Sequence, residues 1–212
     1  MGIIELKNIC KKFDNKIIFD NYSLTVEEGE FVSIMGKSGK GKTTLLNIIG
    51  MLEKPDEGSI KICGVENPHF NSQKGIKLLR NDISYLFQNY GLIDAETVEY
   101  NLKVAVKFLK LSNKEKQDKI KAVLEKVGLN GFEKKKIYQL SGGEQQRVAV
   151  AKLFLKPSKI ILADEPTGSL DFENEQIIMK MLQELNSQGR TIVVVTHSKN
   201  VMTYATRNIV LE

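Results

Sequence analysis

An eight-residue glycine-rich segment between two apolar runs constrains the fold of this chain more than any other feature. The segment is Gly36–Thr43, and its sequence GKSGKGKT fits the pattern G-x-x-x-x-G-K-[ST] at every fixed position. Residues 31–35 before it read as a strand, and residues 44–49 after it read as a helix. A chance glycine turn would not need these two neighbours, whereas a phosphate-binding loop requires them. We therefore expect an α/β fold that carries such a loop.

Each part of this loop has a physical role in holding a phosphate. Glycine leaves room for backbone N–H groups to approach an anion, and the following helix N-terminus adds a favourable dipole. Lys42 is expected to reach the β- and γ-phosphates of a nucleotide, and Thr43 to offer its hydroxyl to Mg²⁺. The predicted binding residues of the loop are Gly36, Lys37, Ser38, Gly39, Lys40, Gly41, Lys42, Thr43 and Thr44.

Two adjacent acids, Asp164 and Glu165, end a second apolar run at residues 159–163. Because side chains alternate across a strand, the two carboxylates need not share a role. Asp164 is expected to hold Mg²⁺ through a coordinated water, and Glu165 to polarise an attacking water. In isolation such a pair would more simply be a solvated turn. Together with the phosphate loop, it favours a nucleotide-hydrolysing site.

The octapeptide at residues 140–147 supplies a third element. Ser141 and Glu144 form a capping-box pattern at the start of an expected helix, residues 145–155. Gly142 and Gly143 lie at its first turn, although a glycine inside a helix costs about 0.5–1 kcal/mol relative to alanine. Close approach of a phosphate to the helix N-terminus would explain both. Because the chain already has one phosphate loop, the spare anion-binding helix predicts that two copies of the chain share ATP.

These motifs and their order resemble the nucleotide-binding subunit of ATP-binding cassette (ABC) transporters along nearly the whole chain, and LSGGEQQR is among that family's most specific motifs. The resemblance implies that Gln88 contacts Mg²⁺ and the membrane partner, and that His197 contacts the γ-phosphate. It also places Asp171 in the D-loop and implies that Phe13 stacks on adenine. A single Phe is more often a core residue and a single His more often a surface or capping residue, so the order of the motifs carries these assignments.

The predicted site is thus defined residue by residue. The predicted catalytic residues are Glu165, His197, Lys42 and Gln88. The predicted Mg²⁺ ligands are Thr43, Gln88 and Asp164. Besides the loop residues, the predicted ATP-binding set contains Phe13, Ser141, Gly142, Gly143, Glu144 and Asp171.

Periodicity indicates how the rest of the chain is organised. Alternating apolar residues at 3–13 and 17–26 predict an antiparallel β-subdomain, and helical periodicity begins near residue 92. Together with the resemblance, these patterns predict one domain with the P-loop NTPase fold of ABC ATPases. Its RecA-like core and β-subdomain are expected at 1–91 and 157–212, and an inserted helical subdomain at 92–156.

Composition restricts the location of the chain. Its longest uncharged apolar stretch, residues 45–52, is far shorter than the roughly 20 residues that span a bilayer. The first residues do not form a signal peptide. Cys10 and Cys63 are isolated in sequence, which suggests neither a disulfide framework nor a zinc site. We therefore expect a cytoplasmic protein that is peripheral on the cytoplasmic face of the cell membrane through a partner.

Charge is concentrated between Lys103 and Lys136, which include eleven lysines against four acidic residues in a chain of net charge +5. A solvated helical face and a face toward an anionic membrane leaflet both fit this surplus. Nucleic-acid binding is not expected, because no aromatic-interleaved basic stripe accompanies the lysines.

Finer resemblance concerns the biological role. Residues 31–36, 46–50 and 163–171 are similar to the MacB and LolD group, and residues 89–99 are similar to ATPases of bacteriocin export and immunity. The resemblance implies a head-to-tail homodimer around two ATP that powers a separate integral membrane permease, exporting a peptide, bacteriocin, antibiotic or lipoprotein. A soluble ABC ATPase of translation or DNA repair and a signalling scaffold of the FtsE type are the alternatives.

The segment after Gln88 is a candidate surface for that permease. Tyr90, Leu92 and Ile93 make it too apolar for a free loop. Packing of these side chains onto the core is the alternative, because burial is the usual explanation for such a run.

Overall fold

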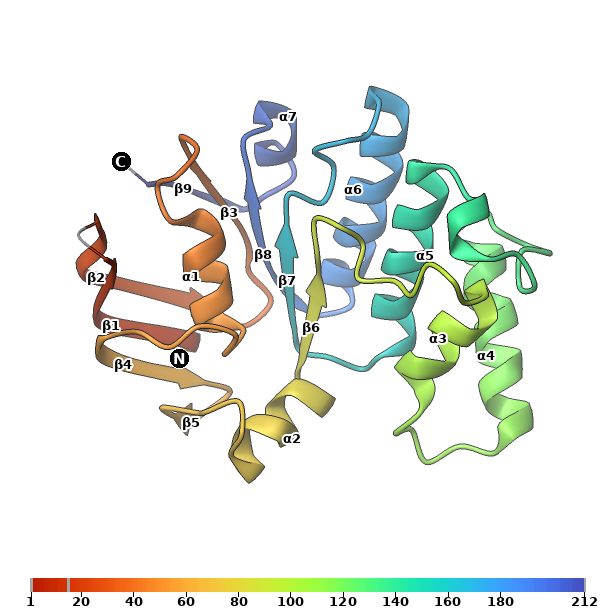
Figure 1. Cartoon of the computed structure of the whole chain (residues 1–212), viewed down its shortest axis with the longest axis horizontal. Coiled ribbons are helices and arrows are strands. Elements are labelled where there is room, and N and C mark those ends of the chain that lie inside the picture. Colours follow the sequence, from red (N-terminus) through yellow and green to blue (C-terminus); the bar gives the residue numbers. More distant parts are fainter. Residues whose placement is uncertain (1, 15, 212) are drawn as a thin grey trace.

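The computed structural model describes residues 2–14 and 16–211. Met1 and Glu212, the two ends of the predicted domain, and Asn15 lie outside the described residues. The strands form two sheets, and helices cover them (Figure 1). In chain order the elements are β1 (Gly2–Phe13), β2 (Lys16–Glu27), β3 (Phe31–Gly36), α1 (Lys42–Ile49), β4 (Glu57–Ile62), β5 (Val65–Glu66), α2 (Gln73–Asn81), β6 (Ile83–Leu86), α3 (Val98–Val106), α4 (Asn113–Lys126), a 3₁₀ helix (Ile137–Gln139), α5 (Gly142–Leu155), β7 (Ile160–Asp164), α6 (Phe172–Ser187), β8 (Thr191–Thr196), α7 (Lys199–Met202) and β9 (Arg207–Leu211).

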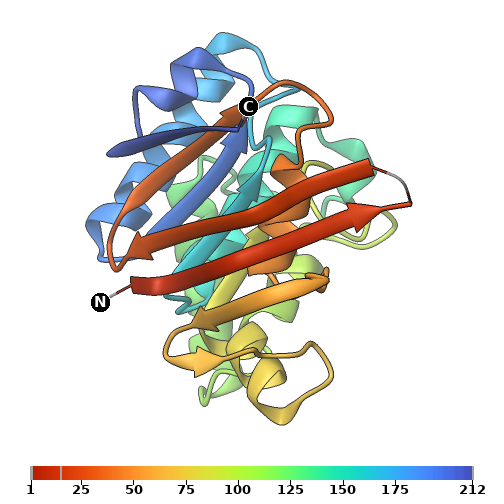
Figure 2. The ribbon, with the colours of Figure 1, turned by 90° about the vertical axis from the view of Figure 1, so that its left-hand side faces the viewer.

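The antiparallel sheet predicted at the N-terminus is present. Its strand order is β2-β1-β4-β5, and Figure 2 shows its long strands crossing one side of the molecule. Ile4 pairs with Val26 and Leu6 with Leu24, so alternate apolar side chains of β1 and β2 share one face. That face packs inward and leaves the polar face in solvent.

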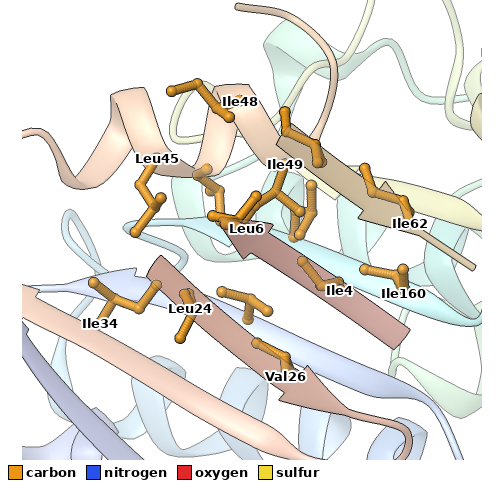
Figure 3. Close-up of a cluster of buried hydrophobic side chains, with 14 of the residues drawn as sticks. Ile4, Leu6, Leu24, Val26, Ile34, Leu45, Ile48, Ile49, Ile62 and Ile160 are labelled. Carbon is orange, nitrogen blue, oxygen red and sulfur yellow. The ribbon is translucent and has the colours of Figure 1, made fainter. Parts of the chain in front are cut away.

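Helix α1 lies between this sheet and a parallel one. The parallel sheet has the order β6-β7-β8-β3-β9. Leu45, Leu46, Ile48 and Ile49 of α1 are fully buried in a cluster that contains residues of both sheets (Figure 3). Because α1 follows the glycine loop directly, this packing fixes the loop against the middle of the core.

The parallel sheet is buried on both faces. In β8, Val193 and Val195 belong to the cluster around α1, whereas Ile192 and Val194 belong to a second cluster with α5 and α6. This period of two is what a strand buried on both sides requires. All five residues of β7 are buried, so the strand that ends at the paired acids runs through the centre of the fold.

A third buried cluster joins α3, α4 and α5. It includes Leu102, Leu124 and Val148, while α5 also contributes Ala149 and Leu153 to the second cluster. The predicted boundaries at 92 and 156 stay a prediction, since α5 belongs to both clusters. The lysine-rich stretch covers the exposed faces of α3 and α4 and the loop after α4, an arrangement that favours neither interpretation of its charge.

Two remaining expectations concern the surface and the thiols. Within residues 2–14 and 16–211, no helix is both long and apolar enough to cross a membrane. Cys10 and Cys63 are both free and half-buried. Burial raises the pKa of the Cys63 thiol to about 11, which makes it a poor metal ligand or nucleophile at neutral pH.

Candidate functional site

The glycine loop connects the carboxyl end of β3 to the N-terminus of α1. Gly41 has φ of +89°, and a Cβ there would lie 2.4 Å from the Ile18 side chain. Both the left-handed backbone and the close approach of β2 therefore require glycine. The Lys42 ammonium donates to the carbonyl oxygens of Gly36 at 2.7 Å and Lys37 at 3.3 Å, which holds it above the loop.

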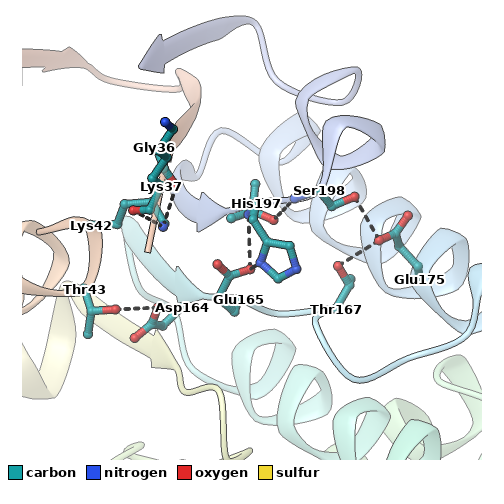
Figure 4. Close-up of polar contacts among 11 residues, drawn as sticks. Gly36, Lys37, Lys42, Thr43, Asp164, Glu165, Thr167, Glu175, His197 and Ser198 are labelled. Carbon is teal, nitrogen blue, oxygen red and sulfur yellow. Dashed lines mark hydrogen bonds and ion pairs between the residues drawn. The ribbon is translucent and has the colours of Figure 1, made fainter. Parts of the chain in front are cut away.

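The two acids at the end of β7 face different partners, as their alternation predicts. Asp164 is 7% exposed, and one of its carboxylate oxygens accepts a hydrogen bond from the Thr43 hydroxyl at 3.2 Å (Figure 4). Burial raises the pKa of Asp164, and the Thr43 hydrogen bond opposes that rise. Two hard oxygen donors, from β7 and from α1, thus meet at the foot of the loop.

Glu165 and His197 form the second contact. The Glu165 Oε2 lies 3.0 Å from His197 Nδ1 and 3.3 Å from the His197 backbone nitrogen, which donates to it. The Glu165 backbone has φ of +43°, a left-handed conformation that costs a non-glycine residue of order 1–3 kcal/mol. Its N–H donates to the Val195 carbonyl oxygen at 2.9 Å, which helps to hold this conformation next to β8.

A cavity of about 960 Å³ gathers most of the predicted site. Its volume and its mixed polar and apolar lining suit a nucleotide. The lining residues are Phe13, Asp14, Lys16, Ile18, Ser38, Gly39, Gly41, Lys42, Thr43, Thr44, Gln88, Glu165 and His197. Elements far apart in the sequence, from β1 to β8, thus converge on one hollow.

Some predicted binding residues lie elsewhere. Gly36, Lys37 and Lys40 line a neighbouring hollow of about 530 Å³ with Val210. The Asp171 carboxylate caps α6 by accepting from the Asn174 backbone N–H at 2.8 Å. These four residues and Asp164 are not in the lining of the main cavity, so their predicted contacts with the nucleotide and Mg²⁺ stay predictions.

The signature peptide also lies outside the main cavity. Ser141 and Glu144 form the predicted capping box at the start of α5. The helix begins at Gly142 rather than at residue 145, because the two glycines form its first turn. A Cβ on Gly143 would lie 2.7 Å from the Asn174 side chain, so close packing of α5 on α6 already favours that glycine. Phosphate approach is therefore not the only reason for it.

Sequence reasoning missed the basic residues beside Phe13. Lys16 pairs with Phe13 in the β1–β2 register, and its ammonium donates to the Gly39 carbonyl oxygen at 3.1 Å. Lys11 is 8% exposed, and its ammonium lies 2.7 Å from a Glu53 carboxylate oxygen and 4.9 Å from the centroid of the Phe13 ring. The alternation of β1 could have revealed Lys11, because residues 11 and 13 share one face. No sequence pattern predicts that Glu53 is the partner of Lys11.

Comparison with known proteins assigns the chain to a family. The profile of the family described as ABC transporter matches residues 19–168. The chain belongs to the ABC transporter family. The predicted ABC ATPase fold and the assignment to the MacB-like group are confirmed by the relatives that follow.

Three relatives place it more finely within the ABC transporter family. The macrolide export ATP-binding/permease protein MacB of Mannheimia succiniciproducens is 40% identical over 98% of this chain and 33% of its own length. The chain thus spans about a third of the MacB relatives that it matches. The ABC transporter ATP-binding protein MJ0796 of Methanocaldococcus jannaschii, an uncharacterized protein, is 41% identical over 99% of this chain and 93% of its own length. The bacitracin export ATP-binding protein BceA of Halalkalibacterium halodurans is 37% identical over 100% and 86%.

The fold of this ABC cassette is also found in a solved structure of MJ0796. That structure is dimeric and represents a post-hydrolysis state bound to ADP and Pi. It superimposes with a TM-score of 0.89 at 39% identity, over 99% of this chain and 94% of that chain. The chain is therefore an ATP-binding ATPase subunit of the family.

Replacement of Phe13 by alanine tests the adenine-stacking role. The ring is 44% exposed at the cavity rim. Loss of stacking is expected to weaken binding of ATP and GTP alike, by about 1–3 kcal/mol, because every base has a π face. Titration with both nucleotides measures this, and Phe70→Ala, an exposed phenylalanine outside the cavity, is the control. A loss confined to ATP would contradict simple stacking.

Proposed function

We propose that this ABC subunit hydrolyses ATP as a head-to-tail homodimer and thereby powers a separate integral membrane permease. The observation that carries this proposal is the position of the capped, glycine-rich N-terminus of α5, which lies outside the cavity around the chain's own phosphate loop. A helix N-terminus with free N–H groups suits an anion. In a head-to-tail dimer, that helix end of one copy would face the γ-phosphate bound to the other copy. The MJ0796 structure is dimeric, which supports dimerisation of this subunit.

Within each site, the chain's own residues would bind and orient ATP. Loop N–H groups around Ser38 and Gly39 would cradle the phosphates, and the Lys42 ammonium would compensate the charge of the β- and γ-phosphates. Phe13 would stack on adenine at the cavity rim. The ammonium of Lys16, already on the Gly39 carbonyl, would add positive charge beside the loop.

The residues at the foot of the loop fit Mg²⁺. Thr43 and Gln88 line the cavity, and the buried Asp164 carboxylate presents an oxygen 3.2 Å from the Thr43 hydroxyl. Mg²⁺ prefers one or two protein oxygens together with substrate phosphates and water. These three side chains would hold the ion, directly or through water, and the ion would neutralise charge on the phosphates.

Glu165 would act as the general base. Its carboxylate would accept a proton from the water that attacks the γ-phosphorus, as the bond from that phosphorus to the β–γ bridging oxygen breaks and ADP and phosphate form. His197 lies 3.0 Å from that carboxylate and is exposed at the cavity. From there it would contact the γ-phosphate and keep Glu165 oriented.

Export is the transport direction that the relatives support. MacB is named for macrolide export and BceA for bacitracin export, which suggests an antibiotic, peptide, bacteriocin or lipoprotein as cargo. The subunit would then work on the cytoplasmic face of the cell membrane, peripheral through its permease. Substrate movement into inside-out vesicles tests export. ATP-dependent binding to the permease without any movement would instead favour the signalling function.

Ser141→Arg tests the composite site. The bulky cation at the N-terminus of α5 is expected to stop hydrolysis while the ATP affinity of the isolated chain stays nearly unchanged, because Ser141 is outside that chain's cavity. Mixing this variant with Lys42→Ala is expected to restore at most one of the two composite sites, since a mixed dimer pairs one intact phosphate loop with one intact α5 N-terminus. Steady-state phosphate release measures both effects. Normal activity of Ser141→Arg alone would show that the signature helix is only structural.

Docking of the permease is tested at exposed apolar side chains near Gln88. Tyr90 and Leu92 pack against buried clusters, so for them the core interpretation holds in part. Ile93 and Val104 are 49% and 48% exposed. Ile93→Asp is expected to reduce co-purification of the permease at least about tenfold, with unchanged ATPase activity and melting temperature. Ile17→Asp, at a still more exposed isoleucine (68%) on the antiparallel sheet, is the control. Unchanged permease binding in Ile93→Asp would exclude docking there.

A further inference from the structure

Glu175 of α6 joins two loops that follow catalytic candidates. Its Oε2 accepts hydrogen bonds from the Thr167 hydroxyl at 3.1 Å and the Ser198 hydroxyl at 3.2 Å (Figure 4). Its Oε1 accepts from the Asn200 side-chain amide at 2.6 Å. One half-buried carboxylate thus takes three donors from two different segments of the chain.

The two segments are those that carry Glu165 and His197. Thr167 lies two residues after Glu165 and is 4% exposed, so its hydroxyl has little access to water. Ser198 directly follows His197. The His197–Glu165 contact joins the same segments on the side of the cavity. The segments that carry Glu165 and His197 are therefore joined twice, by the Glu165–His197 contact at the cavity and by the hydrogen bonds of Glu175 on the other side.

The backbone conformation of Glu165 explains why the hydrogen bonds of Glu175 are needed. Its φ of +43° is unfavourable for a residue with a Cβ, and such conformations persist only where surrounding contacts hold them. The Val195 carbonyl holds the N–H of Glu165 on one side. On the other side the chain turns through a Gly168 N–H bond to the Glu165 carbonyl oxygen at 3.1 Å, and Thr167 lies inside that turn. Glu175 anchors this turn through Thr167.

The length and the two oxygens of the Glu175 side chain suit this position. Glu175 lies in the first turn of α6, and from there Oε2 reaches two hydroxyls while Oε1 reaches an amide. Aspartate is one methylene shorter, and glutamine has only one acceptor oxygen, so neither could take all three donors in this arrangement.

We propose that Glu175 is a positioning residue for ATP hydrolysis, which holds Glu165 and His197 in register through Thr167, Ser198 and Asn200. The inference rests on the proposed function, in which Glu165 is the base. A misplacement of a reacting group by about 1 Å can cost about 10²-fold in rate. Loss of the three Glu175 hydrogen bonds should therefore lower the rate of the chemical step. ATP binding should be unchanged, because Glu175 is not in the lining of the nucleotide cavity.

The test compares Glu175→Ala with Glu173→Ala in the full chain. Glu173 is an exposed acid in the same first turn of α6, and the substitution there removes the same charge. Glu175→Ala is expected to lower kcat about 10- to 100-fold, with the KM and Kd for ATP within about threefold of wild type. Glu173→Ala is expected to keep wild-type kcat. Glu175→Gln, which keeps the shape and one acceptor oxygen, should recover part of the loss.

A double-mutant cycle guards against a variant that simply folds poorly. In wild-type background, Thr167→Val and Ser198→Ala are each expected to lower kcat. With Glu175→Ala already present, neither should lower it much further, because their shared acceptor is gone. Wild-type kcat in Glu175→Ala, or equal losses in kcat and bound ATP that follow the folded fraction, would overturn the proposal. No ATPase activity in the wild-type chain itself would instead contradict the proposed function.

Discussion

Glu165→Gln is expected to lose ATP turnover by about 10²–10⁴-fold while still binding ATP, because glutamine keeps the shape of the side chain but cannot accept a proton from water. The Glu165 side chain is only 13% exposed, lines the nucleotide cavity, and its Oε2 lies 3.0 Å from His197 Nδ1. Single-turnover phosphate release and nucleotide titration together measure the two quantities.

The control for this variant is Glu173→Gln, which changes an exposed acid outside the cavity in the same way. It is expected to turn over like wild type. Near-normal phosphate release by Glu165→Gln would remove Glu165 from the role of general base, and another group would have to activate the water.

Lys42→Ala is expected to lower kcat/KM for ATP by more than about 10²-fold, since removal of one preorganised donor to developing phosphate charge has a cost of that size. The Lys42 ammonium is held above the loop by the Gly36 and Lys37 carbonyls, so it is preorganised where the phosphates would bind. Unlike Glu165→Gln, this variant should also lose ATP affinity, because charge compensation acts on the bound substrate as well.

Lys40→Ala provides the matched comparison within the same loop. Its side chain lines the neighbouring hollow, so a loss of less than about tenfold is expected. Isothermal titration with ATP and steady-state ATPase assays distinguish the two lysines. Equal effects at Lys40 and Lys42 would indicate that the loop needs only general positive charge, and unchanged activity in Lys42→Ala would contradict the phosphate-loop assignment.

Local motifs predicted much of this fold because their physics is local. The strand, glycine loop and helix at 31–49 form as expected, since each part is specified by residues within one short segment. The capping box at Ser141 and the different contacts of Asp164 and Glu165 follow from neighbouring residues in the same way. These local motifs identified the loop, Asp164 and Glu165 as candidates, whereas Phe13, Gln88 and His197 were predicted from the resemblance to ABC ATPases.

Contacts between distant segments could not be predicted in this way. Glu175 meets Ser198 across 23 residues, and Lys11 meets Glu53 only because β1 lies beside the loop after α1. No local pattern marks either acid, as charged residues on a helix or in a loop are usually solvated. The packing of Gly143 on Asn174 likewise depends on how α5 meets α6, which a single sequence does not specify.

The shared ATP site is the central claim, and the mass of Glu165→Gln in solution tests it most directly. With ATP bound and hydrolysis blocked, two copies should be held together by nucleotide between the phosphate loop of one and the α5 N-terminus of the other. Light scattering after size-exclusion chromatography with ATP is expected to give twice the 23.9 kDa of one chain, and a single-chain mass without nucleotide. Adding Ser141→Arg should return the ATP-bound protein to 23.9 kDa. A monomer of Glu165→Gln at saturating ATP, or a dimer that Ser141→Arg does not disturb, would contradict the account.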